Sequence, residues 1–169
     1  MNKQMQKGQI VKVGMADWKS TAAPDTLRTS GLGSCIGVVV YEKRRKIAAL
    51  AHIMLPDSSM ARQKEWNRAK FADSALEDMF TYFQHLGLRS YQLTAKMAGG
   101  AQMFAASSHT SEMMRIGPRN AEAVKKILAL HRVRLEGEDT GGSKGRTIEF
   151  DPEDSTLSIR IVHRGEKVL

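Results

Sequence analysis

Two apolar runs, separated by a short charged segment, constrain the fold more than any other part of this sequence. The first run, "CIGVVVY" (35–41), is rich in β-branched residues, and the second is "IAALAHIML" (47–55). The "EKRRK" between them (42–46) places its charges where a solvated turn can hold them. Neither run alternates between apolar and polar residues, which is typical of strands buried on both faces. The sequence therefore predicts an antiparallel hairpin in a sheet that is covered on both sides.

The rest of the pattern predicts further strands and two helices. Apolar residues at helical spacing indicate a helix over 69–86 and another over 117–131, whereas "EDTGGSKG" (138–145) predicts a loop. Short apolar segments predict strands at 10–15, 27–29, 91–97, 132–135, 147–150 and 156–162. With the hairpin this makes about eight strands and two helices, an α+β fold in which sheets dominate. We expect one domain over 1–169, with residues 1–8 flexible.

Charge and cysteine content limit the classes of function. The 169 residues carry 26 Lys and Arg against 18 Asp and Glu, and the net charge of +8 favours acidic partners. A nucleic-acid partner is not expected, because no recognised motif occurs, aromatic residues make up 6% and basic residues are not clustered. A single cysteine and no signal-peptide pattern indicate a reducing cytoplasm. The longest apolar run, 47–55, is too short for membrane insertion.

The lone cysteine, Cys35, directly follows "GLGS" (31–34). Most free cysteines are buried and inert, so a core position is one interpretation. A nucleophile is the other, because glycines weaken a strand but allow backbone N–H groups to approach a substrate oxyanion. In that case Gly33 and Ser34 would form the oxyanion loop.

A nucleophilic thiol needs a base, and His52 is the candidate because it lies inside the second apolar run. The predicted hairpin brings the start of one strand to the end of the other, and so places Cys35 near His52. A histidine satisfied within the core is the alternative. Thr29 and Asp57 are both candidates to orient the imidazole, and each also suits an ordinary strand or turn position. Because no Cys or His pair has ligand spacing, we expect neither a metal nor a cofactor.

Six ordered segments of the sequence form a pattern that one family shares. They are "TSGLGSCIGVVVY", "AHIMLPDS", "KFADSAL", "KMAGGAQMF", "IGPRNAEAVKKIL" and "EDTGG" with a following Arg146. In this order they resemble the chemoreceptor glutamine deamidase family, CheD, over nearly the whole chain. The resemblance implies layered β-sheets, or a sandwich, with about two helices packed on one side, a fold related to bacterial deamidating toxins.

The resemblance also implies an activity and partners. The family converts glutamine side chains of methyl-accepting chemotaxis receptors to glutamate through a cysteine thioester, and releases ammonia. Its cysteine, histidine and threonine match Cys35, His52 and Thr29. It also binds the phosphatase CheC, for which the aromatic Phe104 is the candidate contact. Two rival functions stay open: hydrolysis of a receptor methyl ester by the same thiolate, and a non-catalytic module that binds CheC or an acidic partner.

Overall fold

The computed structural model describes residues 7–103 and 115–169 of the chain. Most of the segment expected to be flexible, residues 1–6, therefore lies outside the described residues. The strands are β1 (Ile10–Lys12), β2 (Trp18–Ala22), β3 (Thr26–Leu32), β4 (Ile36–Glu42), β5 (Ile47–Ile53), β6 (Thr94–Gly99), β7 (Arg134–Thr140), β8 (Arg146–Asp151), β9 (Thr156–Ile161) and β10 (Gly165–Val168). The helices are α1 (Ala72–His85) and α2 (Ile116–Leu130), with short 3₁₀ helices η1 (Ser58–Met60), η2 (Arg68–Lys70) and η3 (Ser90–Gln92).

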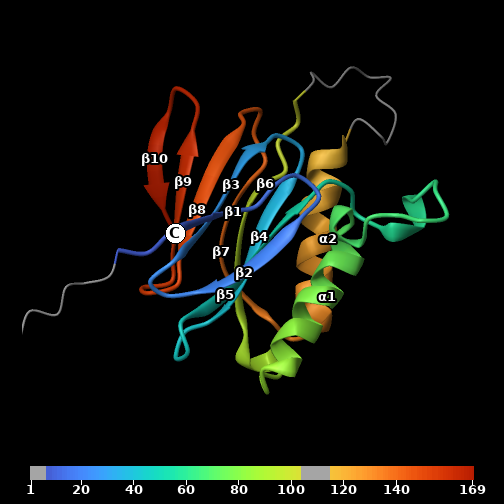
Figure 1. The fold of residues 1–169 in the computed structure, drawn as a ribbon. Helices are drawn as coiled ribbons and strands as arrows, with labels where there is room; N and C mark the ends of the chain where they lie inside the picture. Colours follow the sequence, from blue (N-terminus) through green and yellow to red (C-terminus); the bar gives the residue numbers. More distant parts are fainter. Residues whose placement is uncertain (1–6, 104–114) are drawn as a thin grey trace, which may run out of the picture.

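The strands form two five-stranded sheets that lie face to face (Figure 1). The first sheet has the order β1-β3-β8-β9-β10, and the second has the order β2-β5-β4-β6-β7. Both helices lie on the outer face of the second sheet, so this sheet is covered on both sides. The layered α+β fold predicted from the sequence is therefore confirmed. No helix within the described ranges is both long and apolar enough to cross a membrane.

The predicted hairpin forms the centre of the second sheet. β4 and β5 pair antiparallel, with Gly37 opposite His52 and Glu42 opposite Ile47. β4 also pairs with β6, so both of its edges are hydrogen-bonded. Every residue of β4 up to Tyr41 is buried, as the absence of alternation in its sequence predicts.

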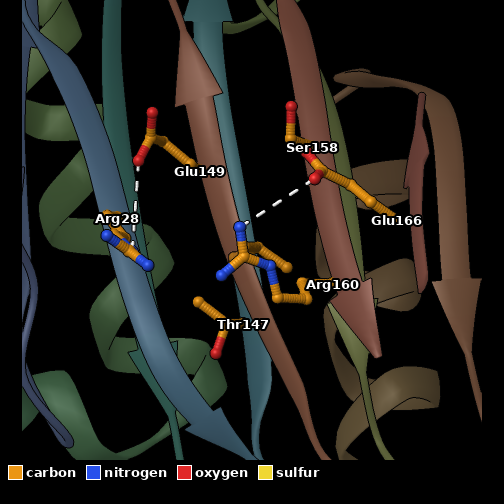
Figure 2. Close-up of a pocket in the computed structure, with 7 residues that line it drawn as sticks. Arg28, Thr147, Glu149, Ser158, Arg160 and Glu166 are labelled. Carbon is orange, nitrogen blue, oxygen red and sulfur yellow. Dashed lines mark ion pairs between the residues drawn. The ribbon is translucent and has the colours of Figure 1, made fainter. Parts of the chain in front are cut away.

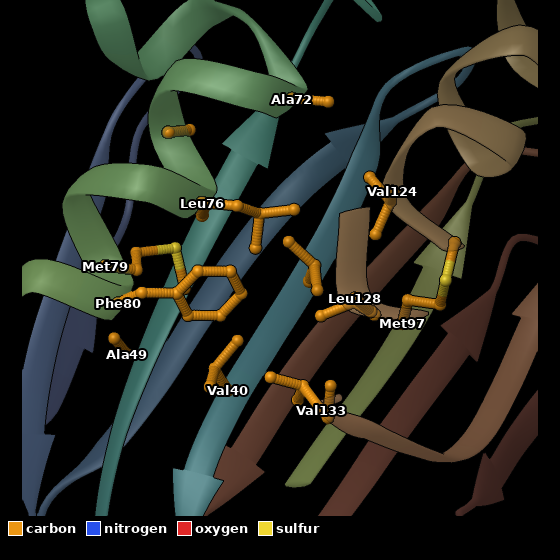
Figure 3. Packing of buried hydrophobic residues seen from close by; sticks show 14 of the residues in the cluster. Val40, Ala49, Ala72, Leu76, Met79, Phe80, Met97, Val124, Leu128 and Val133 are labelled. Atoms are coloured by element: carbon orange, nitrogen blue, oxygen red, sulfur yellow. The ribbon is translucent and has the colours of Figure 1, made fainter. Parts of the chain in front are cut away.

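Side chains of β4 alternate between two cores. Val38 and Val40 face the helices, where they pack with Leu76, Met79 and Leu128 (Figure 3). Each large apolar side chain buried in this way contributes about 1.5–3 kcal/mol to stability. This core joins both helices to the second sheet.

The alternate residues of β4 face the first sheet. Val39 and Tyr41 pack there with Leu27 of β3 and with Ile148 and Phe150 of β8. Cys35 lies at the edge of this second core, half-buried. The inter-sheet layer thus reaches the thiol, which places Cys35 on the face toward the first sheet.

The structure differs from the sequence predictions mainly at sheet edges. β2 and β10 were not predicted, because "WKSTA" has no apolar run and every residue of "GEKV" is exposed. β7 continues through 138–140, which the glycines nearby had indicated as a loop, because pairing with β6 extends it to Thr140. Helix α1 begins at Ala72 and not at 69, because Arg68–Lys70 forms a 3₁₀ turn.

Candidate active site

The start of β4 and the end of β5 place Cys35 and His52 on one face of the second sheet. Gly37 stands opposite His52 in the antiparallel register, and Cys35 precedes Gly37 by two residues. Side chains two residues apart point to the same face, so the thiol and the imidazole are diagonal neighbours. Gly37 adds no side chain between them. A Cβ at this position would lie 2.5 Å from Ile148 Cδ1, so a larger residue here would push the Ile148 side chain of the first sheet aside.

Thr29 of the first sheet reaches across the interface to His52. Its Oγ1 donates a hydrogen bond to the carbonyl oxygen of Val13 (2.8 Å) and lies 2.8 Å from Nδ1 of His52. A hydroxyl has one proton, so Thr29 accepts from His52, and the imidazole carries its proton on Nδ1. Nε2 is then the basic nitrogen. It is buried and has no hydrogen-bond partner among the described residues.

Asp57, the other candidate to orient the imidazole, has a different role. Its side chain accepts a hydrogen bond from the backbone N–H of Ser59 (2.7 Å) and caps the 3₁₀ helix η1. Hydrogen bonds from the backbone and the side chain of Ser59 hold the pKa of the Asp57 carboxyl below its ordinary value. The described contacts therefore pair the ring of His52 with Thr29.

Hydrogen bonds to three consecutive carbonyl groups hold the loop before β4 in place. The carbonyl oxygen of Gly33 accepts from Ala101 N (2.8 Å), and that of Cys35 accepts from Gly100 N (2.9 Å). Between them, the carbonyl oxygen of Ser34 accepts from Nδ2 of Asn120 (3.0 Å). In a planar trans peptide the N–H points away from the C=O, so the N–H groups of Ser34 and Cys35 point away from these anchors. Neither donates to another backbone carbonyl within the described part of the chain.

The turn after β6 supports this loop by close backbone contact. Gly99 (φ +114°) and Gly100 (φ +64°) adopt conformations that favour glycine, and a Cβ on Gly99 would lie 2.2 Å from the carbonyl oxygen of Cys35. Arg146, which is 6% exposed, donates to the carbonyls of Gly99 and Gly141 and pairs with Asp139. A buried arginine thus ties the turn after β6 to the turn after β7.

Burial keeps the thiol and the imidazole neutral at rest. Desolvation raises the pKa of Cys35, and a hydrogen bond from its own backbone N–H opposes this rise. Desolvation lowers the pKa of His52, which is 1% exposed. Both shifts keep the proton on sulfur and leave Nε2 unprotonated, so the pair suits general-base activation of the thiol.

A hollow on the outer face of the first sheet lies away from these groups. About 150 Å³ in volume, it is lined mostly by polar and charged residues, among them Thr147 and Ser158 (Figure 2). Its arginines form long ion pairs, Arg28 with Glu149 at 4.0 Å and Arg160 with Glu166 at 3.9 Å. Exposed ion pairs of this kind contribute little, and none of the candidate residues lines the hollow.

Comparison with known proteins places the chain in a family. The family model described as CheD chemotactic sensory transduction matches residues 54–161. The chemoreceptor glutamine deamidase CheD of Halalkalibacterium halodurans is 56% identical over 158 residues, which cover 94% of this chain and 97% of that protein. The Bacillus subtilis protein of the same name is 49% identical and covers 95% and 96% of the two chains. The chain belongs to the CheD family.

The CheD fold of this chain is also similar to a solved structure outside the family. The crystal structure of a Neisseria meningitidis protein of the DUF152 family superposes with a TM-score of 0.51 at 9% sequence identity. The match covers 80% of this chain and 65% of that protein. At this identity the similarity concerns the layered fold alone.

The sequence also led to expectations about metal ligands and about Phe104, and it left one residue of this CheD site, Asn120, unnoticed. No three His, Cys, Asp or Glu side chains gather as metal ligands within residues 7–103 and 115–169. Phe104, the candidate contact for CheC, lies outside the described residues. Sequence reasoning missed Asn120 as a site residue, although it lies in the "IGPRN" segment that carries part of the resemblance.

Proposed function

We propose that this chain hydrolyses the side-chain amide of glutamine residues in chemoreceptors, giving glutamate and ammonia through a thioester on Cys35. The observation that carries the proposal is the orientation of His52. The hydrogen-bond chain from His52 through Thr29 to Val13 leaves a free basic Nε2 on the face that Cys35 shares. The family membership and the names of the relatives supply the substrate class.

The acylation step begins with transfer of the Cys35 proton to Nε2 of His52. The sulfur attacks the amide carbon, and the carbonyl oxygen becomes an oxyanion. The N–H groups of Ser34 and Cys35, which have no other backbone acceptor in the described part of the chain, are the donors for this oxyanion. When the tetrahedral intermediate collapses, the C–N bond breaks and the imidazolium gives its proton to the leaving NH₂. Ammonia departs and a thioester remains.

Hydrolysis of the thioester uses the same histidine. Nε2 of His52 takes a proton from water, and the resulting hydroxide attacks the thioester carbon. The C–S bond then breaks, the thiolate recovers the proton from His52, and glutamate leaves. Thr29 acts through His52 by keeping the Nδ1–H tautomer, in which Nε2 accepts protons in both steps.

The test measures glutamine-to-glutamate conversion in a purified receptor cytoplasmic fragment by peptide mass spectrometry, together with ammonia release. We expect conversion by the wild type and none by Cys35→Ala, whose folding is checked by thermal denaturation. Equal conversion by Cys35→Ala would contradict the mechanism. Methanol release from a methylated fragment without ammonia would favour the ester hydrolase.

We also propose that the chain works in the cytoplasm and binds the phosphatase CheC. The six sequence segments that resemble the family support this partner. A pull-down with purified CheC tests it, with the Cys35→Ala variant as a matched bait. Failure of both baits to retain CheC would remove this part of the proposal and leave the deamidase unaffected.

A further inference from the structure

Asn120 joins the two chain segments that carry the candidate nucleophile and base. It lies in the second turn of α2 and is completely buried. Its Nδ2 donates one hydrogen bond to the carbonyl oxygen of Ser34 (3.0 Å) and another to that of Met54 (2.9 Å). Ser34 immediately precedes Cys35, and Met54 follows His52 by two residues. One side-chain amide therefore spans the ends of β4 and β5 from outside the sheet.

The orientation of this amide is fixed by its partners. Both are carbonyl oxygens, which only accept, so the NH₂ group must face them. Its Oδ1 is left buried without a hydrogen-bond partner in the described structure. A buried acceptor without a donor costs stability. A helix that needed only an apolar contact here would avoid this cost with leucine or alanine, so the two donors of Asn120 are the feature that requires explanation.

The first turn of α2 is built to bring Asn120 into reach. A Cβ at Gly117 would lie 2.4 Å from the carbonyl oxygen of Ala101 and 2.6 Å from that of Gly100, so the helix rests directly on backbone here. The same two residues donate their N–H groups to Gly33 and Cys35. Helix α2, the turn after β6 and the cysteine loop thus form one packed unit.

The bond to Ser34 also controls the peptide that links Ser34 to Cys35. Because this peptide is planar and trans, fixing the direction of its C=O fixes the opposite direction of the Cys35 N–H. Anchors on the neighbouring carbonyls of Gly33 and Cys35 restrain the same segment from both sides. Of the three anchors, Asn120 alone is a side chain, so it can be changed without altering the backbone.

We infer that Asn120 is a positioning residue, which sets the direction of the Cys35 N–H and the separation of Cys35 from His52. The effect of Asn120 on oxyanion binding rests on the proposed deamidation. Its effect on the Cys35 thiol does not, because the reactivity of Cys35 measures that effect directly.

The experiment compares Asn120→Ala with Val124→Ala, a truncation of a completely buried residue one turn further along the same face of α2. The first readout is the pH profile of alkylation by iodoacetamide, which reports Cys35 alone because the chain has one cysteine. The second is kcat and KM for ammonia release from the receptor fragment. Thermal denaturation measures the stability lost in each variant.

We expect Asn120→Ala to move the midpoint of the alkylation profile to higher pH, because it loosens the backbone N–H of Cys35, whose hydrogen bond opposes the burial-driven rise in the thiol pKa. We also expect it to lower kcat about 10- to 100-fold with little change in KM, because small displacements of reacting groups have effects of this size. Val124→Ala should lose stability but keep the wild-type profile and kcat. If Asn120→Ala does not fold, Asn120→Asp replaces it. Its protonated carboxyl can donate to one of the two carbonyls, and we expect an intermediate shift.

A wild-type alkylation profile and kcat in a folded Asn120 variant would overturn the inference, as would equal effects of Asn120→Ala and Val124→Ala. A shifted profile in a protein that releases no ammonia, even as wild type, would support the positioning of the thiol and contradict the deamidase instead. The two proposals therefore fail separately.

Discussion

Replacing Thr29 with valine tests the hydrogen-bond chain behind the imidazole. Valine keeps the shape of threonine but lacks the hydroxyl, so the buried carbonyl of Val13 loses a donor and Nδ1 of His52 loses an acceptor. Thr29 is 2% exposed, so water cannot readily replace either bond. Each buried group left unpaired costs about 1–3 kcal/mol, or about 2–6 kcal/mol together. For a chain of this length the Tm should fall by about 5 °C or more.

The loss of activity should exceed what this instability explains. Without Thr29 the ring of His52 can rotate and can carry its proton on Nε2, where it no longer accepts from the thiol. We expect kcat for ammonia release to fall about 10- to 1,000-fold at equal folded concentration, less than on loss of the nucleophile or base. Thr29→Ser, which keeps the hydroxyl and loses a methyl group, should retain kcat within a few-fold. Wild-type kcat in folded Thr29→Val would refute the assignment of Thr29 as the orienting group.

Two further predictions concern His52 and Gly99. Burial lowers the pKa of His52 below 6.5, so just below this pH the imidazole is protonated in the unfolded chain but not in the folded chain. Stability should be full above pH 6.5 and fall by up to about 1.4 kcal/mol per pH unit as the pH drops below it. Denaturant titrations at several pH values measure this dependence. The free energy of unfolding should depend less steeply on pH in His52→Gln than in the wild type, and an equal dependence would contradict the neutral buried imidazole. Gly99→Ala would drive a Cβ into the carbonyl of Cys35, so stability should fall by about 1–3 kcal/mol and ammonia release should collapse. A Cβ added at Gly14 would have no atom within 4 Å, so Gly14→Ala should change neither stability nor ammonia release. Wild-type stability and ammonia release in Gly99→Ala would show that the turn is free to move.

The central hairpin could be predicted because its signal is local. Two uninterrupted apolar runs flank a charged turn, and the register that follows places Cys35 beside His52. The edge strands could not be predicted in the same way. β2 and β10 are stabilised by pairing with a neighbour, and their own residues are polar or exposed, so no periodicity marks them.

The candidate site residues differ in the same way, between those that share one local element and those that distant elements bring together. Cys35 and His52 share one hairpin, but Thr29 meets His52 only because two sheets stack, which no short segment of sequence encodes. Asn120 is separated by 86 positions from Ser34. Its sequence signal is the "IGPRN" segment, in which Gly117 allows the close approach of α2 that places the amide. Residues that hold a site together are thus harder to find from sequence than residues that lie within one of its elements.

The neutral resting pair also explains why the site needs so many anchors. An ion pair between thiolate and imidazolium would hold itself together by Coulomb attraction, whereas burial keeps Cys35 and His52 uncharged. Their geometry must therefore come from the surroundings: Thr29 behind the ring, and Asn120 and the turn after β6 behind the cysteine. In the proposed mechanism, charge develops only when the sulfur attacks a carboxamide. In such a site rigidity replaces electrostatic attraction, so loss of an anchor should reduce turnover even where both reacting side chains remain.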